Sequence, residues 1–207
     1  MVSQMQTLRN TLPQLRNELL LTDSGIETTL IFHEGFDLPC FAVYPLLETP
    51  AGREALARYY RRHLALAADH GLGFVLEAPT WRANRDWGAQ LGHGPKDLAR
   101  FNREAVGFLT DLRGEARGVR PIVVSGNLGP RGDGYRPDTA MTAEEAEAYH
   151  AEQIGWFVET DVDMVAGFTL STVAEGVGVI RAAAKAGLPV AVAYTVETDG
   201  RLPDGTA

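Results

Sequence analysis

The sequence has a single cysteine, Cys40, among its 207 residues. One cysteine excludes an intrachain disulfide and a metal site built from several cysteines of this chain, and it is typical of a reducing compartment. Apolar runs are also short, because none approaches the roughly 20 residues that a bilayer-spanning helix needs. The first 18 residues lack the apolar core of a secretory signal. We therefore expect a cytoplasmic protein with no membrane partner.

Positive charge is scarce as well. Lys and Arg total 19 against 27 Asp and Glu, which gives a formal net charge of −8 and a pI near 5.1. An acidic surface repels phosphate backbones, so nucleic acid is not an expected partner. Hydrophobic residues make up 45% of the chain, as in ordinary globular proteins, and the length suits one domain or one large domain cut short.

Short apolar runs predict five strands. They do not alternate with polar residues, which is typical of parallel strands covered on both faces. The predicted strands cover residues 19–21, 74–76, 122–124, 164–168 and 190–194. Residues 1–18 are polar and contain Pro13, so we expect them to form a loosely attached lead-in to a domain of residues 19–207.

Helical patterns separate the predicted strands. Apolar residues recur at helical spacing over residues 50–70 and 95–113, and Thr49 before Pro50 is a suitable N-cap for the first of these helices. Two further helices are predicted by capping-box spacing, in which a threonine is followed three residues later by a glutamate. These pairs are Thr142 with Glu145 and Thr172 with Glu175.

Alternating strands and helices predict a parallel sheet, either an open doubly wound sheet or a (β/α)8 barrel. A dinucleotide-binding open sheet would show G-x-G-x-x-G directly after its first strand. Here that strand leads into Asp23-Ser24-Gly25-Ile26-Glu27, which does not match. The pattern favours an α/β fold of the (β/α)8 TIM-barrel type, here a partial barrel of about five parallel β/α units.

In either architecture, ligands bind at the carboxyl ends of the parallel strands. Asp23, Glu77 and Glu197 each come within three residues of the end of a predicted strand, so we expect them to share one cavity. Together such carboxylates are suited to hold the amino group of an amino-acid ligand. The alternative is that they cap the following helices or pair with Arg82 and Arg131.

Four segments, in order along the chain, carry a resemblance to a known family. They are LTDSGIETTL, LEAPTWRANRDWG, VVSGNLGPRGDGY and GLPVAVAYTVETDGRLPDGT. From about Leu19 to Thr206 the chain resembles the homocysteine S-methyltransferase family. The resemblance implies a (β/α)8 barrel that transfers a methyl group from a sulfonium, betaine or folate donor to homocysteine. It also implies a zinc ion that binds the homocysteine thiol, held by three cysteines that follow the sixth and eighth strands.

The sequence departs from that family pattern in two places. None of the three zinc-binding cysteines is present, and Cys40 matches none of them. A complete barrel needs about 250 residues, so we expect five of the eight units, a missing zinc-binding part and a chain that is inactive alone. In the fourth strand Phe168 stands where many relatives place a glutamate. Thr169 or Glu77 then takes that role, or the methyl acceptor differs.

These inferences give a set of candidate substrate-binding residues and no catalytic or metal-binding residue within this chain. Asp23 and Glu27 are expected near the amino acid or its thiol, Glu77 and Trp81 in the acceptor pocket, and Asp133 at its mouth. The full set is Asp23, Gly25, Glu27, Glu77, Thr80, Trp81, Asn127, Arg131, Asp133, Thr169 and Glu197.

The expected substrates are homocysteine and a methyl donor such as S-methylmethionine or S-adenosylmethionine. One alternative is an inactive truncated barrel that acts as a binding module or as half of a hetero-assembly, and open barrel edges would favour self-association. Another is an unrelated barrel enzyme that uses its carboxylates as acid and base.

Overall fold

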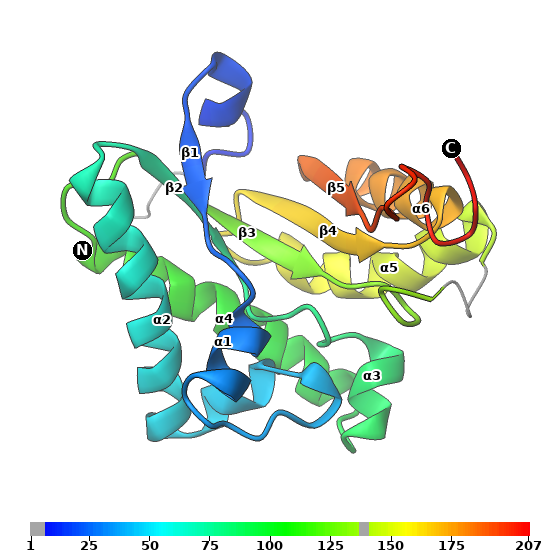
Figure 1. Ribbon diagram of the computed structural model, residues 1–207, viewed down its shortest axis with the longest axis horizontal. Coiled ribbons are helices and arrows are strands. Elements are labelled where there is room, and N and C mark those ends of the chain that lie inside the picture. The colour runs from blue at the N-terminus through cyan, green and yellow to red at the C-terminus, as the bar shows by residue number, and fades with distance from the viewer. Residues whose placement is uncertain (1–6, 137–140) are drawn as a thin grey trace.

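The computed structural model describes residues 7–136 and 141–207. Five parallel strands form one curved sheet in the order β1-β2-β3-β4-β5 (Figure 1). The strands are β1 (Leu20–Thr22), β2 (Gly73–Glu77), β3 (Ile122–Leu128), β4 (Met164–Leu170) and β5 (Val190–Tyr194). All five predicted strands are thus confirmed, with ends that differ by a few residues.

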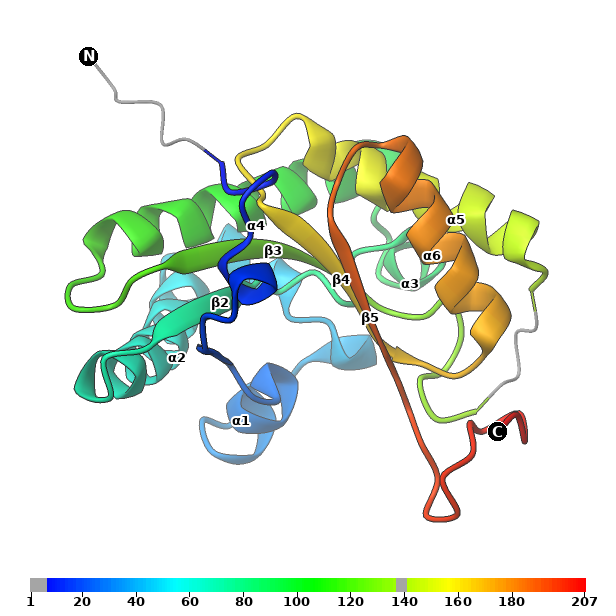
Figure 2. The same ribbon diagram turned by 90° about the horizontal axis from the view of Figure 1, so that it is seen from above.

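The strand order decides between the two architectures. In a doubly wound sheet the order in which strands are added reverses at a switch point, so some consecutive strands are not neighbours. In a barrel each new strand is added beside the previous one, always on the same side. Here every strand pairs with the next one along the chain, and the sheet curls with its four long helices on the convex side (Figure 2). The fold is therefore a partial (β/α)8 barrel, as the sequence predicts.

The four predicted helices are present, and two of the expected caps form as the sequence indicates. Thr49 accepts a hydrogen bond from Gly52 N, and Thr142 and Glu145 form a reciprocal capping box. Two short helices, α1 and α3, were not predicted. The helices are α1 (Ile26–Phe32), α2 (Pro50–Asp69), α3 (Arg85–Gln90), α4 (Pro95–Glu115), α5 (Ala143–Val158) and α6 (Val173–Lys185), with 3-10 turns at Pro13–Arg16, Pro39–Phe41 and Tyr44–Glu48.

The core lies on both faces of the sheet. Val124 and Val165 pack into the large cluster between the strands and the outer helices. Their neighbours Val123 and Met164 point to the concave face, because side chains alternate along a strand. No helix among the described residues is long and apolar enough to cross a membrane.

The expectation of a loosely attached lead-in is wrong for residues 8–12. Leu12 is buried on the concave face against Val123 and Met164. Leu8 N donates to Asp163 Oδ1 at 2.6 Å, and the Arg9 side chain donates to backbone carbonyls that precede β4. Apolar contact and hydrogen bonds together fix this segment across the amino-terminal end of the sheet interior.

Candidate functional site

A cavity of about 580 Å³ opens at the carboxyl ends of β1 to β4. This volume falls in the range of small-molecule sites. Its walls come from the β1–α1 loop, the segment after β2, the end of β3 with its loop, and the end of β4. Eight of the eleven predicted residues line it: Asp23, Gly25, Glu27, Glu77, Trp81, Asn127, Asp133 and Thr169.

The carboxyl groups of this cavity are held away from water. Glu77 is 7% exposed and its Oε2 has no hydrogen-bond partner. Burial raises the pKa of Glu77 to about 8, and the charge of Asp23 adds to the rise. The Ser125 hydroxyl lies beside the carboxyl and opposes the rise, but the two make no hydrogen bond of ordinary geometry.

Asp23 behaves in the same way. Burial raises the pKa of Asp23 to about 7, against the lowering effect of Tyr59. Burial also raises the pKa of Glu27. A carboxyl group that is kept from water and lacks a cation favours its neutral form, and a bound cation would reverse this preference. The cavity is therefore suited to a positively charged ligand group.

The loop that carries Asp23 is fixed by a tyrosine of α2. Ser24 N donates to Tyr59 Oη at 3.1 Å, and the Tyr59 hydroxyl donates to Ser24 O at 2.6 Å. His63, one turn further along α2, lies with its Nε2 at 3.2 Å from Ser24 Oγ. These contacts set the position of the first carboxylate relative to the sheet.

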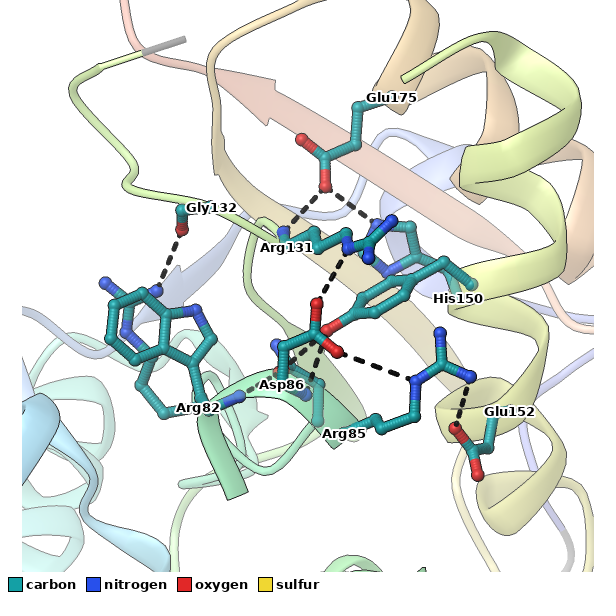
Figure 3. A network of polar contacts seen from close by, with 11 residues as sticks. Arg82, Arg85, Asp86, Arg131, Gly132, His150, Glu152 and Glu175 are labelled. Carbon is teal, nitrogen blue, oxygen red and sulfur yellow. Dashed lines mark hydrogen bonds and ion pairs between the residues drawn. The ribbon is translucent and has the colours of Figure 1, made fainter. Parts of the chain in front are cut away.

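Arg82 lies between two indole rings. Its guanidinium carbon is 3.8 Å from the ring centroid of Trp81 and 3.7 Å from that of Trp87. Its Nη1 donates to Gly132 O at 3.2 Å (Figure 3). Burial lowers the pKa of Arg82 to about 10, so the side chain stays charged at neutral pH. From the sequence, Arg82 is expected only as a pairing partner of the strand-end carboxylates, and nothing in its motif signals that it is buried.

Thr169 has an unusual backbone conformation at the end of β4. Its φ is 57°, which is rare for a β-branched residue, and the pairing with β5 shifts register between Gly167 and Leu170. Trp81 Nε1 donates to Thr169 Oγ1 at 3.1 Å, so the threonine fixes the indole that forms one wall of the cavity. Strain of this kind gathers at functional sites.

Three predicted residues do not line the cavity. Thr80 is fully buried behind it and donates to Asn127 O at 2.8 Å. Arg131 turns away to pair with Asp86, with Nε at 2.7 Å from Oδ2 (Figure 3). Glu197 is exposed in the turn after β5, where its N–H donates to Arg201 O. Of the three strand-end carboxylates, the structure therefore brings together two.

A buried polar network supports the loop after β3. Glu175 Oε1 accepts from the backbone N–H of Arg131 at 2.8 Å and lies 2.9 Å from His150 Nε2 (Figure 3). The Thr172 hydroxyl still accepts from Glu175 N, so half of the predicted capping box forms. The glutamate side chain is instead used across the helices, which a spacing rule does not reveal.

The described residues do not fit the zinc ion that the resemblance implies. Within residues 7–136 and 141–207, no group of three His, Cys, Asp or Glu side chains could hold a metal. Cys40 lies in the loop after α1, with Sγ 3.9 Å from Gln90 Oε1. We therefore assign no step to a metal held by these residues.

Comparison with solved structures finds the same fold in the homocysteine methyltransferase MmuM from Escherichia coli. Its metallated form superposes with a TM-score of 0.73 at 21% identity, over 94% of this chain and 69% of that one. The oxidized form gives a TM-score of 0.72 at 19% identity, over 98% of this chain and 70% of the other. No curated protein matches by sequence.

The comparison of the sequence with protein families gives a match over nearly the whole chain. The model described as Homocysteine S-methyltransferase matches residues 19–207, which contain every strand and helix α1 to α6. The chain therefore belongs to the homocysteine S-methyltransferase family.

Proposed function

We propose that this chain forms the amino-acid-binding part of an S-methyltransferase that converts homocysteine to methionine. The observation that carries the proposal is the pair of carboxyl groups, buried Glu77 and half-buried Asp23, in one cavity of small-molecule size. An ammonium group entering between them would favour their ionised forms and so gain two charged acceptors. Thr169 and Trp81 would then close the wall where relatives carry a further acid.

The proposed reaction joins a thiolate to a methyl group. The homocysteine sulfur attacks the methyl carbon of a sulfonium, a new carbon–sulfur bond forms, and the old one breaks with its electrons going to the donor sulfur. The donor leaves as a neutral thioether. An acidic cavity attracts a cation, which favours S-methylmethionine or S-adenosylmethionine as the donor.

Thiol activation by zinc would require ligands that the described residues do not supply. We propose that such ligands come from further residues or from a second chain, and that the 207 residues alone do not turn over. The same observation favours a second candidate, an inactive module that binds an amino acid or joins a hetero-assembly. No other strand of residues 7–136 and 141–207 pairs with the outer edges of β1 and β5, so these edges are available for such an association. We place the protein in the cytoplasm.

Calorimetric titration with L-homocysteine tests the amino-acid site, and a methyl-transfer assay with added zinc tests activity. We expect binding without turnover, and we expect Asp23→Asn to weaken binding roughly 10-fold or more through loss of a charged acceptor. Asp69→Asn, at the exposed end of α2, is the matched control and should bind as the wild type does. Absence of homocysteine binding would refute the site, and turnover by the chain alone would refute its inactivity.

A further inference from the structure

Arg82 is a buried charge without an ion-pair partner. Its residue exposure is 6%, and among the described residues no carboxylate oxygen lies within 4.0 Å of its guanidinium nitrogens. The buried Arg113 shows the ordinary arrangement, with Nη1 2.8 Å from Asp163 Oδ2. Burying a charge is costly unless an opposite charge accompanies it. Asp133 and Glu27 favour the charged form of Arg82 only from beyond that distance. Among the described residues, the Arg82 guanidinium therefore has no directly bonded anion.

The hydrogen-bonding capacity of Arg82 is mostly unused. A guanidinium has five N–H donors, and only Nη1 makes a hydrogen bond with a described residue, to Gly132 O. Nε is buried with no partner. The two indole rings stabilise the positive charge by lying against the two faces of the guanidinium group, but they accept no hydrogen bond from the N–H groups along its edge.

The same two indole rings fix the direction in which the N–H edge of the Arg82 guanidinium points. Trp81 is itself held by Thr169, and Trp87 N is bonded to the cap residue Asn84. The guanidinium plane is thus held on both sides. A planar donor edge of this kind matches a carboxylate in a two-pronged arrangement.

Resting on the proposed function, we propose that Arg82 binds the α-carboxylate of the amino-acid substrate and so determines specificity for amino acids over simple amines or thiols. Arg82, Asp23 and Glu77 line the same cavity. The cavity lining offers both a cation and carboxyl groups, which complement the two opposite charges of a zwitterion. The chemical class selected is an α-amino acid.

Titration of the 207-residue protein with two related thiols tests this role. L-Homocysteine is compared with 3-aminopropane-1-thiol, which keeps the thiol and amine but lacks the carboxylate. We expect the wild type to bind homocysteine roughly 10- to 100-fold more tightly, the range for hydrogen bonds to a charged group. Arg82→Met should bind the two compounds equally, and Arg82→Lys should retain part of the preference because it keeps the charge without the planar edge.

Arg85→Met is the matched control, because Arg85 lies three residues further on, faces the ring of Tyr149 and is exposed. It should behave as the wild type. Tryptophan emission gives a second readout, since homocysteine bound at Arg82 adjoins both indoles and should change their emission in the wild type but not in Arg82→Met. Thermal unfolding of each variant checks that the variant is folded. If Arg82→Met is not folded, Arg82→Lys is used for the test in its place.

The outcomes separate the two proposals. If homocysteine binds and every Arg82 variant keeps the full preference over 3-aminopropane-1-thiol, the role of Arg82 is overturned while the methyl-acceptor site stands. If inorganic phosphate binds in an Arg82-dependent way and homocysteine does not, the amino-acid assignment of both proposals is overturned. Binding of none of these compounds overturns both.

Discussion

Replacement of Glu77 by glutamine should stabilise the protein, and increasingly so as the pH rises. The carboxyl group is 7% exposed, has an unbonded oxygen and has no cation beside it. Ionising it in the folded state is therefore unfavourable, whereas in the unfolded chain it ionises freely. A glutamine of the same shape does not ionise in either state.

The magnitude follows from the two pKa values of Glu77. The ordinary value is 4.5 and burial raises it to about 8. Below pH 4.5 both states hold the proton and the group contributes nothing. As the pH rises further, the unfolded state loses its proton first, so the folded state loses stability until the pH passes about 8. At about 1.36 kcal/mol per pH unit, this loss is under about 1 kcal/mol at pH 5 and about 3 kcal/mol at pH 7.

Urea unfolding of the wild type and Glu77→Gln at pH 5 and pH 7 measures the effect. We expect similar stability at pH 5 and an advantage of about 2 to 3 kcal/mol for the variant at pH 7. The same variant should bind homocysteine more weakly, because an amide cannot become the charged acceptor of an ammonium group. Equal pH dependence in the two proteins would refute the burial of an unpaired carboxyl at this position.

Four further outcomes are expected. Glu175→Gln should lower the free energy of unfolding by about 1 to 3 kcal/mol at pH 7, because Oε1 of the buried Glu175 contacts both Arg131 N and His150 Nε2; an unchanged urea midpoint would contradict this. Homocysteine affinity measured by calorimetry should rise between pH 6 and pH 8 as Asp23, with a pKa of about 7, ionises, and a flat profile would argue against its role. Gly126→Ala places a Cβ 2.8 Å from the Phe157 ring and should cost about 1 to 3 kcal/mol in thermal or urea unfolding. Gly107→Ala meets nothing within 4 Å in a helix and should stabilise by up to about 1 kcal/mol, and the same sign for both alanines would be inconsistent with the packing described.

The strands and long helices were predictable because their signals are local. Apolar runs marked every strand, and the threonine caps at Thr49, Thr142 and Thr172 fixed three helix starts. The short helices α1 and α3 were missed because six or seven residues carry too little apolar periodicity to separate a helix from a loop.

The site was predictable in its place and only partly in its members. Strand-end position located most of the cavity wall, since the carboxyl ends of parallel strands meet at one edge. It failed for Glu197, because the chain after β5 forms a tight turn whose backbone bonds leave that side chain in solvent. It missed Arg82, because the burial of this arginine depends on Trp87, which the unpredicted helix α3 carries.

The segment before β1 shows that the residues matched by a family model and the residues that fold together as one unit need not be the same. The match begins at residue 19, but Leu8 and Leu12 shield Val123 and Met164 from water on the concave face. A protein trimmed to residues 19–207 would expose Val123 and Met164 to water on the concave face of the sheet. It would also remove the Leu8 N–H that donates to the buried Asp163. The boundaries of this domain for expression are therefore better chosen to include the residues that cover its apolar interior than to begin at the first matched residue.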